Sequence, residues 1–116
     1  MMDSPDSVVK EVRKSDAATV VALTGDVDLT HAPALHATLV EIASRRPKCL
    51  IVDLGEVPYM DSSGVGTLVE ILRRVTSYKG RMALVRLNPR VRSVFEITKL
   101  DKFFTICETE QEVLEA

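Results

Sequence analysis

The 116-residue sequence is short of aromatic side chains, of cysteine and of net charge. It has no tryptophan, and only 4% of its residues are aromatic. The chain therefore has too few aromatic side chains to stack on nucleic-acid bases or to form an aromatic ligand cage. Fifteen Lys and Arg residues stand against 17 Asp and Glu residues, which gives a formal net charge of −2. This balance argues against a basic nucleic-acid module, and we expect no direct nucleic-acid partner.

Only two cysteines are present, Cys49 and Cys107, and neither belongs to a CxxC motif or a Cys/His cluster. Both lie beside apolar residues, so we expect both to be buried, reduced thiols. A disulfide or a metal-binding role is the alternative. We expect neither a metal nor a cofactor.

Long apolar runs are also missing. No stretch approaches the ~20 residues that a membrane span needs, and the polar start of the chain, residues 1–14, has no apolar segment of a signal peptide. We therefore expect a cytoplasmic protein without membrane contact. Hydrophobic residues nevertheless make up 46% of the chain, enough for the core of one domain. The expected organisation is a flexible N-terminus at residues 1–7 and one domain at residues 8–116.

Apolar periodicity predicts the element order β-β-α-β-α-β-α-β-α. The expected strands cover residues 8–12, 19–23, 49–54, 82–87 and 103–107. A turn at residues 14–16 makes the first two strands a hairpin, and single helices between later strands imply parallel crossovers. The predicted fold is α/β: a small, mixed, mostly parallel sheet with an antiparallel edge hairpin and about four amphipathic helices.

Polar residues mark the expected helix ends. The predicted N-caps are Thr30, Asp61 or Ser62, and Asn88, and the last helix is expected to start at Thr109. Gly80 is the expected residue just beyond the second helix, where glycine often takes a left-handed conformation. The third helix is expected to present an apolar stripe made of Val91, Val94, Phe95 and Ile97.

The stretch from Val57 to Gly66 is the most informative part of the chain, because it places two serines and two glycines at a strand-to-helix connection. A helix start offers free N–H groups and a positive dipole end, so it would stabilise an attached anion. The simplest interpretation is that Asp61, Ser62 and Ser63 only cap the helix. A phosphate-binding loop lacks its GxxxxGK[ST] spacing, and a nucleophilic serine lacks Gly-x-Ser-x-Gly.

No general base for catalysis stands out. His31 and His36 are the only histidines, five residues apart at the start of a helix, and they are more typical of solvated side chains. We therefore expect no enzyme.

The segment from Tyr59 to Gly66, Tyr-Met-Asp-Ser-Ser-Gly-Val-Gly, closely resembles the Asp-Ser-Ser/Thr-Gly-leucine-Gly signature of bacterial anti-sigma factor antagonists, which belong to the STAS family. Residues 23–28 resemble the early Leu-x-Gly-Glu-Leu-Asp segment of that family. Residues 87–92 resemble its turn into the third helix, and residues 97–104 its Thr-Gly-Leu-Asp segment. The resemblance covers roughly residues 8–115. Lys99 stands where many relatives have glycine, so this turn could be built differently.

The resemblance implies a phosphorylation switch. In similar proteins the first serine after the aspartate, here Ser62, is phosphorylated by a serine kinase that is itself the anti-sigma factor. The unphosphorylated antagonist binds the anti-sigma factor and releases the sigma factor, and a PP2C-type phosphatase resets the switch. The resemblance also implies partner-binding roles for six residues: Asp28, Asp61, Ser62, Ser63, Gly64 and Gly66. We expect a monomer.

Two alternatives stay open at this point. Small STAS proteins also serve as non-switching scaffold subunits of stress-signalling or lipid-transport complexes. An enzyme or nucleotide sensor is the other alternative, although the chain lacks a phosphate-loop lysine and a suitable base. Asp61 and Asp28 also have plain structural interpretations, as a helix cap and a turn former.

Overall fold

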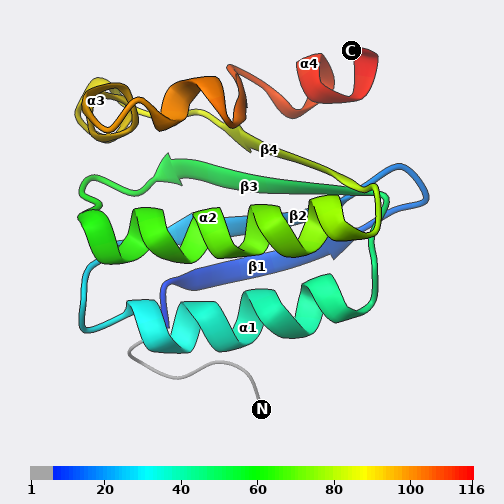
Figure 1. The fold of residues 1–116 in the computed structure, drawn as a ribbon, viewed down its shortest axis with the longest axis horizontal. Coiled ribbons are helices and arrows are strands. Elements are labelled where there is room, and N and C mark those ends of the chain that lie inside the picture. The colour runs from blue at the N-terminus through cyan, green and yellow to red at the C-terminus, as the bar shows by residue number, and fades with distance from the viewer. Residues whose placement is uncertain (1–6) are drawn as a thin grey trace.

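The computed structural model describes residues 7–116 as one five-stranded sheet with helices on both faces (Figure 1). The strands are β1 (Val9–Lys14), β2 (Thr19–Thr24), β3 (Cys49–Glu56), β4 (Arg81–Val85) and β5 (Thr105–Cys107). The helices are α1 (Ala32–Ser44), α2 (Ser62–Ser77), α3 (Pro89–Ile97), the 3₁₀ turn η1 (Leu100–Lys102) and α4 (Glu110–Glu115). The expected flexible N-terminus lies outside the described residues, apart from Ser7.

The sheet order is β1-β2-β3-β4-β5. β1 and β2 pair antiparallel, and all later neighbours pair parallel. The predicted fold class is therefore confirmed. Because the four parallel strands point the same way, the loops that follow β2, β3 and β4 all emerge at one edge of the sheet, which we call the carboxyl edge. In Figure 1 this edge lies at the left, where α2 begins.

Two apolar clusters hold the layers together. The larger one joins one face of the sheet to α1, α2 and α3. Its fully buried members include Leu23, Leu39, Leu50, Leu68, Ile71 and Phe95. The smaller cluster lies on the opposite face, where Val113 of α4 packs over Val20, Ile51 and Val85. Within residues 7–116, no helix has the length and apolar character needed to span a membrane.

The prediction that Thr30 caps the first helix is wrong. His31 is the N-cap residue and makes no side-chain cap bond, while the Asp28 carboxylate accepts a hydrogen bond from the His31 N–H at 3.1 Å. A short aspartate side chain readily bonds the backbone a few residues onward, so Asp28 organises this turn from outside the helix.

The end of α2 also differs from expectation. Lys79, rather than Gly80, adopts the left-handed conformation, with φ of 68°. The Lys79 N–H donates to the Thr76 carbonyl and the Gly80 N–H donates to the Val75 carbonyl, both at 2.9 Å. This is a Schellman motif in which Lys79 takes the position that was expected for Gly80. Gly80 is needed for another reason, since a Cβ there would meet Tyr78 Cε1 at 2.6 Å.

Two residues expected in buried elements face solvent instead. Ile97 is 80% exposed because it lies about 200° around α3 from buried Phe95. Phe103 is 71% exposed, and its neighbour Phe104 takes the inward position, where its ring packs edge-on against Phe95 at 5.5 Å between centroids. The last strand therefore starts at Thr105 rather than at Phe103.

The remaining differences concern strand ends and the cysteines. β1 extends to Lys14, β3 extends to Glu56, and β4 covers residues 81–85. Cys49 is buried as expected, and burial raises the pKa of its thiol. Cys107 is only half-buried, because it ends a three-residue edge strand. Both thiols are free.

Candidate functional site

The candidate site is built from loops at the carboxyl edge that are hydrogen-bonded to one another. An isolated parallel bridge joins Val27, in the β2–α1 loop, to Met60, in the β3–α2 loop. The Val27 N–H donates to the Tyr59 carbonyl at 3.0 Å, and the Asp61 N–H donates to the Val27 carbonyl at 3.2 Å. The bridge places the segment around Asp28 beside the segment that leads to Ser62.

Asn88 ties a third loop into this edge. Its Oδ1 accepts from the Val91 N–H at 2.8 Å, which confirms the predicted cap of α3. Its Nδ2 donates to the Val57 carbonyl at 2.8 Å, 31 residues away along the chain. One half-buried side chain thus caps α3 and fixes the connection between β3 and α2.

Asp61 is the N-cap of α2. Its Oδ1 accepts from the Ser63 N–H at 2.9 Å and from the Gly64 N–H at 3.4 Å. The Val65 N–H already donates to the Asp61 carbonyl at 3.1 Å. The expectation that the helix start offers free N–H groups to an anion is therefore wrong for Ser63 and Gly64, because the Asp61 carboxylate already occupies both.

Ser62 is the first residue of α2 and is exposed. In the part of the chain that the structure describes, no hydrogen bond holds its hydroxyl. Ser63 is half-buried, and its carbonyl accepts from the Thr67 hydroxyl at 3.0 Å. Of the two adjacent serines, Ser62 is thus the more accessible hydroxyl.

Asp28 is turned toward the start of α1. Besides the backbone bond to His31, its Oδ1 lies 2.8 Å from His31 Nδ1. Partial burial alone would raise the pKa of Asp28, but the backbone and ring hydrogen bonds from His31 outweigh it and lower the pKa. Asp28 therefore acts as a turn former within this edge.

The two glycines of α2 have different surroundings. Gly64 is buried, and a Cβ at this position would meet Val27 Cγ1 at 2.7 Å and the Val27 carbonyl oxygen at 2.8 Å. Gly64 therefore serves the close approach of α2 to the β2–α1 loop. Gly66 is exposed, with nothing within 4 Å of a Cβ built there. Of these two glycines, only Gly66 lies at the outer surface of α2, where the absence of a side chain leaves the helix backbone accessible.

Comparison with known proteins places this arrangement in a family. The family model for the STAS domain matches residues 9–113. The chain belongs to the STAS-domain family. It is 31% identical over 96 residues to the anti-sigma-B factor antagonist of Bacillus subtilis, covering 83% of this chain and 87% of that protein. It is 26% identical over 113 residues to the anti-sigma-F factor antagonist RsfB of Mycobacterium tuberculosis, covering 97% and 92% of the two chains.

A solved structure supports the same assignment. The crystal structure of an anti-sigma factor antagonist from Mycobacterium paratuberculosis superposes with a TM-score of 0.85 at 28% sequence identity. The match covers 97% of this chain and 95% of that one. The fold expected from the resemblance is therefore confirmed for this STAS domain.

The histidines of this STAS domain are both engaged with carboxylates. His31 faces Asp28, and His36 Nε2 lies 2.9 Å from Glu70 Oε2, so His36 links α1 to α2. Neither histidine is paired with a serine within residues 7–116. Among the described residues, no group of three His, Cys, Asp or Glu side chains is placed to hold a metal ion.

Two apolar residues at the carboxyl edge escaped the sequence interpretation. Leu29 is 72% exposed in the β2–α1 loop, and Tyr59 is 41% exposed in the β3–α2 loop. Because Val27 bridges to Met60, these loops run side by side and carry the two side chains near Asp61. A signal existed for Leu29, which is an apolar residue among polar neighbours before the helix begins.

Proposed function

We propose that this STAS domain is an anti-sigma factor antagonist whose binding surface is the carboxyl edge of the sheet. In the unphosphorylated form it binds an anti-sigma factor with serine kinase activity and so releases a sigma factor. Phosphorylation of Ser62 switches it off. The observation that carries the proposal is the exposed Ser62 hydroxyl at the start of a 16-residue helix, within a surface whose loops are hydrogen-bonded together.

The capping geometry of Asp61 supports a direct electrostatic switch. A phosphoserine adds about −1.5 to −2 charge at neutral pH. The next two helix N–H groups, those of Ser63 and Gly64, are already bonded to Asp61. The phosphate would therefore stay exposed beside another carboxylate, and a bound partner would have to accommodate its bulk and charge. A change of ~2–4 kcal/mol would weaken binding roughly 30- to 1000-fold.

The surface offers both polar and apolar contacts for such a partner. Leu29 and Tyr59 supply exposed apolar area, and interface energy is concentrated in a few such side chains. Ser62, Ser63 and Gly66 supply small, low-lying contacts at the start of α2. Asp28, Asp61 and Gly64 contribute mainly by shaping the loops, as their internal contacts indicate.

The wider cycle follows from the same proposal. A PP2C-type phosphatase would remove the phosphate, and the chain itself would supply no catalysis. The protein would act in the cytoplasm, since its sigma factor and anti-sigma factor act on transcription there. It would act as a monomer. No nucleic acid or membrane contact is needed for this role.

Phosphorylation by the cognate kinase tests the proposal. The purified protein is incubated with ATP and its cognate anti-sigma factor kinase, and the modified residue is mapped by mass spectrometry. We expect one phosphate on Ser62, unchanged in Ser63→Ala and absent in Ser62→Ala. Phosphate on another residue would overturn the Ser62 assignment. A partner that binds without phosphorylating the protein would indicate the non-switching scaffold role instead.

A further inference from the structure

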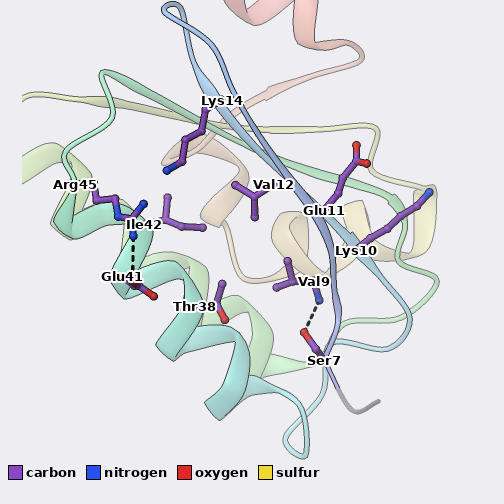
Figure 2. Close-up of a pocket in the computed structure, with 10 residues that line it drawn as sticks. All are labelled: Ser7, Val9, Lys10, Glu11, Val12, Lys14, Thr38, Glu41, Ile42 and Arg45. Atoms are coloured by element: carbon purple, nitrogen blue, oxygen red, sulfur yellow. Dashed lines mark hydrogen bonds and ion pairs between the residues drawn. The ribbon is translucent and has the colours of Figure 1, made fainter. Parts of the chain in front are cut away.

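A groove runs along the β1 side of the sheet, between the edge strand β1 and helix α1, and the proposed switch does not use it. It has a volume of about 600 Å³. Figure 2 shows Val9, Val12 and Ile42 directed into the space between strand and helix, with Lys14 and Arg45 at one end. Val12 is 40% exposed there, although it lies on the same face of the sheet as core residues.

The backbone of β1 is open along the same groove. β1 is the first strand of the sheet order, so β2 is its only partner within the described residues. The Ser15 N–H donates to the Ala18 carbonyl at 2.9 Å and closes the hairpin. Since bonded and non-bonded pairs alternate in an antiparallel ladder, Arg13 faces β2, while Val12 and Lys14 direct their N–H and C=O groups to the open edge.

The open edge of β1 is blocked at the N-terminal end of the strand. The Val9 N–H donates to the Ser7 hydroxyl at 3.1 Å, and the register of β1 shifts between Val9 and Glu11. The bulge and the serine leave Val12 and Lys14 as the residues available for further pairing. An open strand edge beside a helix, with an apolar floor, is the geometry in which an extended peptide adds a strand to a sheet.

Charge indicates which kind of segment fits. Lys10, Arg13 and Lys14 outnumber the single acid Glu11 in β1. Lys10 is paired with Glu56 at 2.6 Å and Arg13 with Glu110 at 2.6 Å. Lys14 has no carboxylate within 4 Å among residues 7–116, and it stands at the groove end near Arg45, which is itself paired with Glu41 at 3.2 Å (Figure 2). An incoming segment would therefore gain from an acidic group at that end.

The same charges disfavour a second copy of the chain as occupant. Antiparallel pairing of β1 with itself must set Val12 and Lys14 against their own counterparts. Two of the three possible registers place Arg13 opposite Arg13 or Lys14 opposite Lys14. The third places Lys14 opposite Lys10 and Arg13 opposite Glu11, but it has to pair across the register shift between Val9 and Glu11. Like charges directly opposite one another destabilise a strand pair.

We propose that the β1–α1 groove binds an extended, acidic peptide segment of another protein, added to β1 as a sixth strand. Alternate apolar side chains of the segment enter the groove over Val12 and Ile42. Its backbone pairs with Val12 and Lys14, and an acidic group meets the Lys14 ammonium. This docking surface is separate from the carboxyl edge, so one molecule can engage a second partner while Ser62 is occupied or phosphorylated.

Selection from a phage-displayed library of random eight-residue peptides tests the proposal, with the full chain as bait. Two variants serve as matched baits: Val12→Lys places a charge in the groove, and Ile97→Lys places the same charge on an exposed apolar residue elsewhere. We expect acidic peptides with alternating apolar residues, bound by the native and Ile97→Lys proteins and at least about tenfold more weakly by Val12→Lys. Recovery of no peptide, or equal binding by Val12→Lys, would overturn the proposal.

Hydrogen exchange of individual amides gives the structural readout for a selected peptide. In the free protein the Arg13 amide should exchange slowly, and the Val12 and Lys14 amides quickly. Peptide binding should slow Val12 and Lys14 and leave Ser62 unchanged. Protection at Ser62 instead would place the peptide at the carboxyl edge, and protection of Val12 and Lys14 by added protein alone would indicate a second copy; either result would contradict the assignment.

Discussion

Gly64 and Val27 lie so close that a Cβ on Gly64 would approach the Val27 carbonyl oxygen to 2.8 Å. This contact joins the start of α2 to the β2–α1 loop, and the hydrogen bonds between Val27, Tyr59 and Asp61 run through the same place. The serine that follows Asp61 is therefore held on a surface whose shape depends on the absence of one methyl group.

The two glycines of α2 should respond in opposite ways to alanine. Gly64→Ala forces backbone atoms apart and should destabilise the protein by about 1–3 kcal/mol. Gly66→Ala meets no neighbour and should stabilise the helix by up to about 1 kcal/mol. Urea denaturation of both variants measures the difference. Equal effects would contradict the close contact between Gly64 and Val27.

Removal of the Asp61 cap should destabilise the domain. Asp61→Ala loses the bonds to the Ser63 and Gly64 N–H groups and should cost about 1 kcal/mol of the free energy of unfolding. Asp61→Asn retains an accepting oxygen and should stay close to the native stability. A loss in Asp61→Asn as large as that in Asp61→Ala would show that the charge, and not the cap, matters.

Leu29 should contribute to binding of the anti-sigma factor but not to folding. It is 72% exposed, so Leu29→Ala should leave the denaturation midpoint unchanged and weaken the complex by about 1–2 kcal/mol. Leu114→Ala, at an exposed position on α4, is the matched control and should bind normally. Isothermal titration calorimetry compares the two, and unaltered affinity of Leu29→Ala would remove this residue from the interface.

Acid should destabilise the domain through carboxylates that are paired in the folded state. The hydrogen bond and charge of Lys10 lower the pKa of Glu56 below its ordinary 4.5. Such a group stabilises the folded state above its ordinary pKa, and this contribution is lost as the pH falls through the lowered value. Glu56→Gln should therefore be less stable than the native protein at pH 6, and the gap should close as the pH falls below the lowered pKa of Glu56. A gap that persists at low pH would contradict this origin.

The order of elements was predictable because apolar spacing alone separates the strands from the helices. The cap Asn88 and the start of the last helix at Thr109 were predictable for a similar reason, since local chemistry decides them. The cap of α2 was predicted as Asp61 or Ser62, and the structure shows that it is Asp61. The prediction that Thr30 caps α1 was wrong because Asp28, two residues earlier, competes for the same turn. The prediction that Ile97 belongs to the apolar stripe of α3 was wrong because only one side of this helix meets the sheet.

The arrangement of the site was only partly predictable. The motif predicts Ser62 as the switch residue, but the occupation of the nearby N–H groups by Asp61 depends on side-chain geometry. The bridge from Val27 to Met60 and the bond from Asn88 to Val57 join segments far apart in the sequence. No local pattern reports such contacts, so the roles of Gly64, Asn88 and Leu29 emerge only from the fold.

Affinity for the anti-sigma factor with and without charge at Ser62 tests the central claim most directly. Binding of Ser62→Ala, Ser62→Asp and native protein, before and after phosphorylation, is measured by calorimetry alongside circular dichroism of each form. The account predicts near-native affinity for Ser62→Ala and a loss of roughly 30-fold or more on phosphorylation, with a smaller loss for Ser62→Asp and no change in fold. Equal affinity of the phosphorylated and unphosphorylated proteins would contradict it.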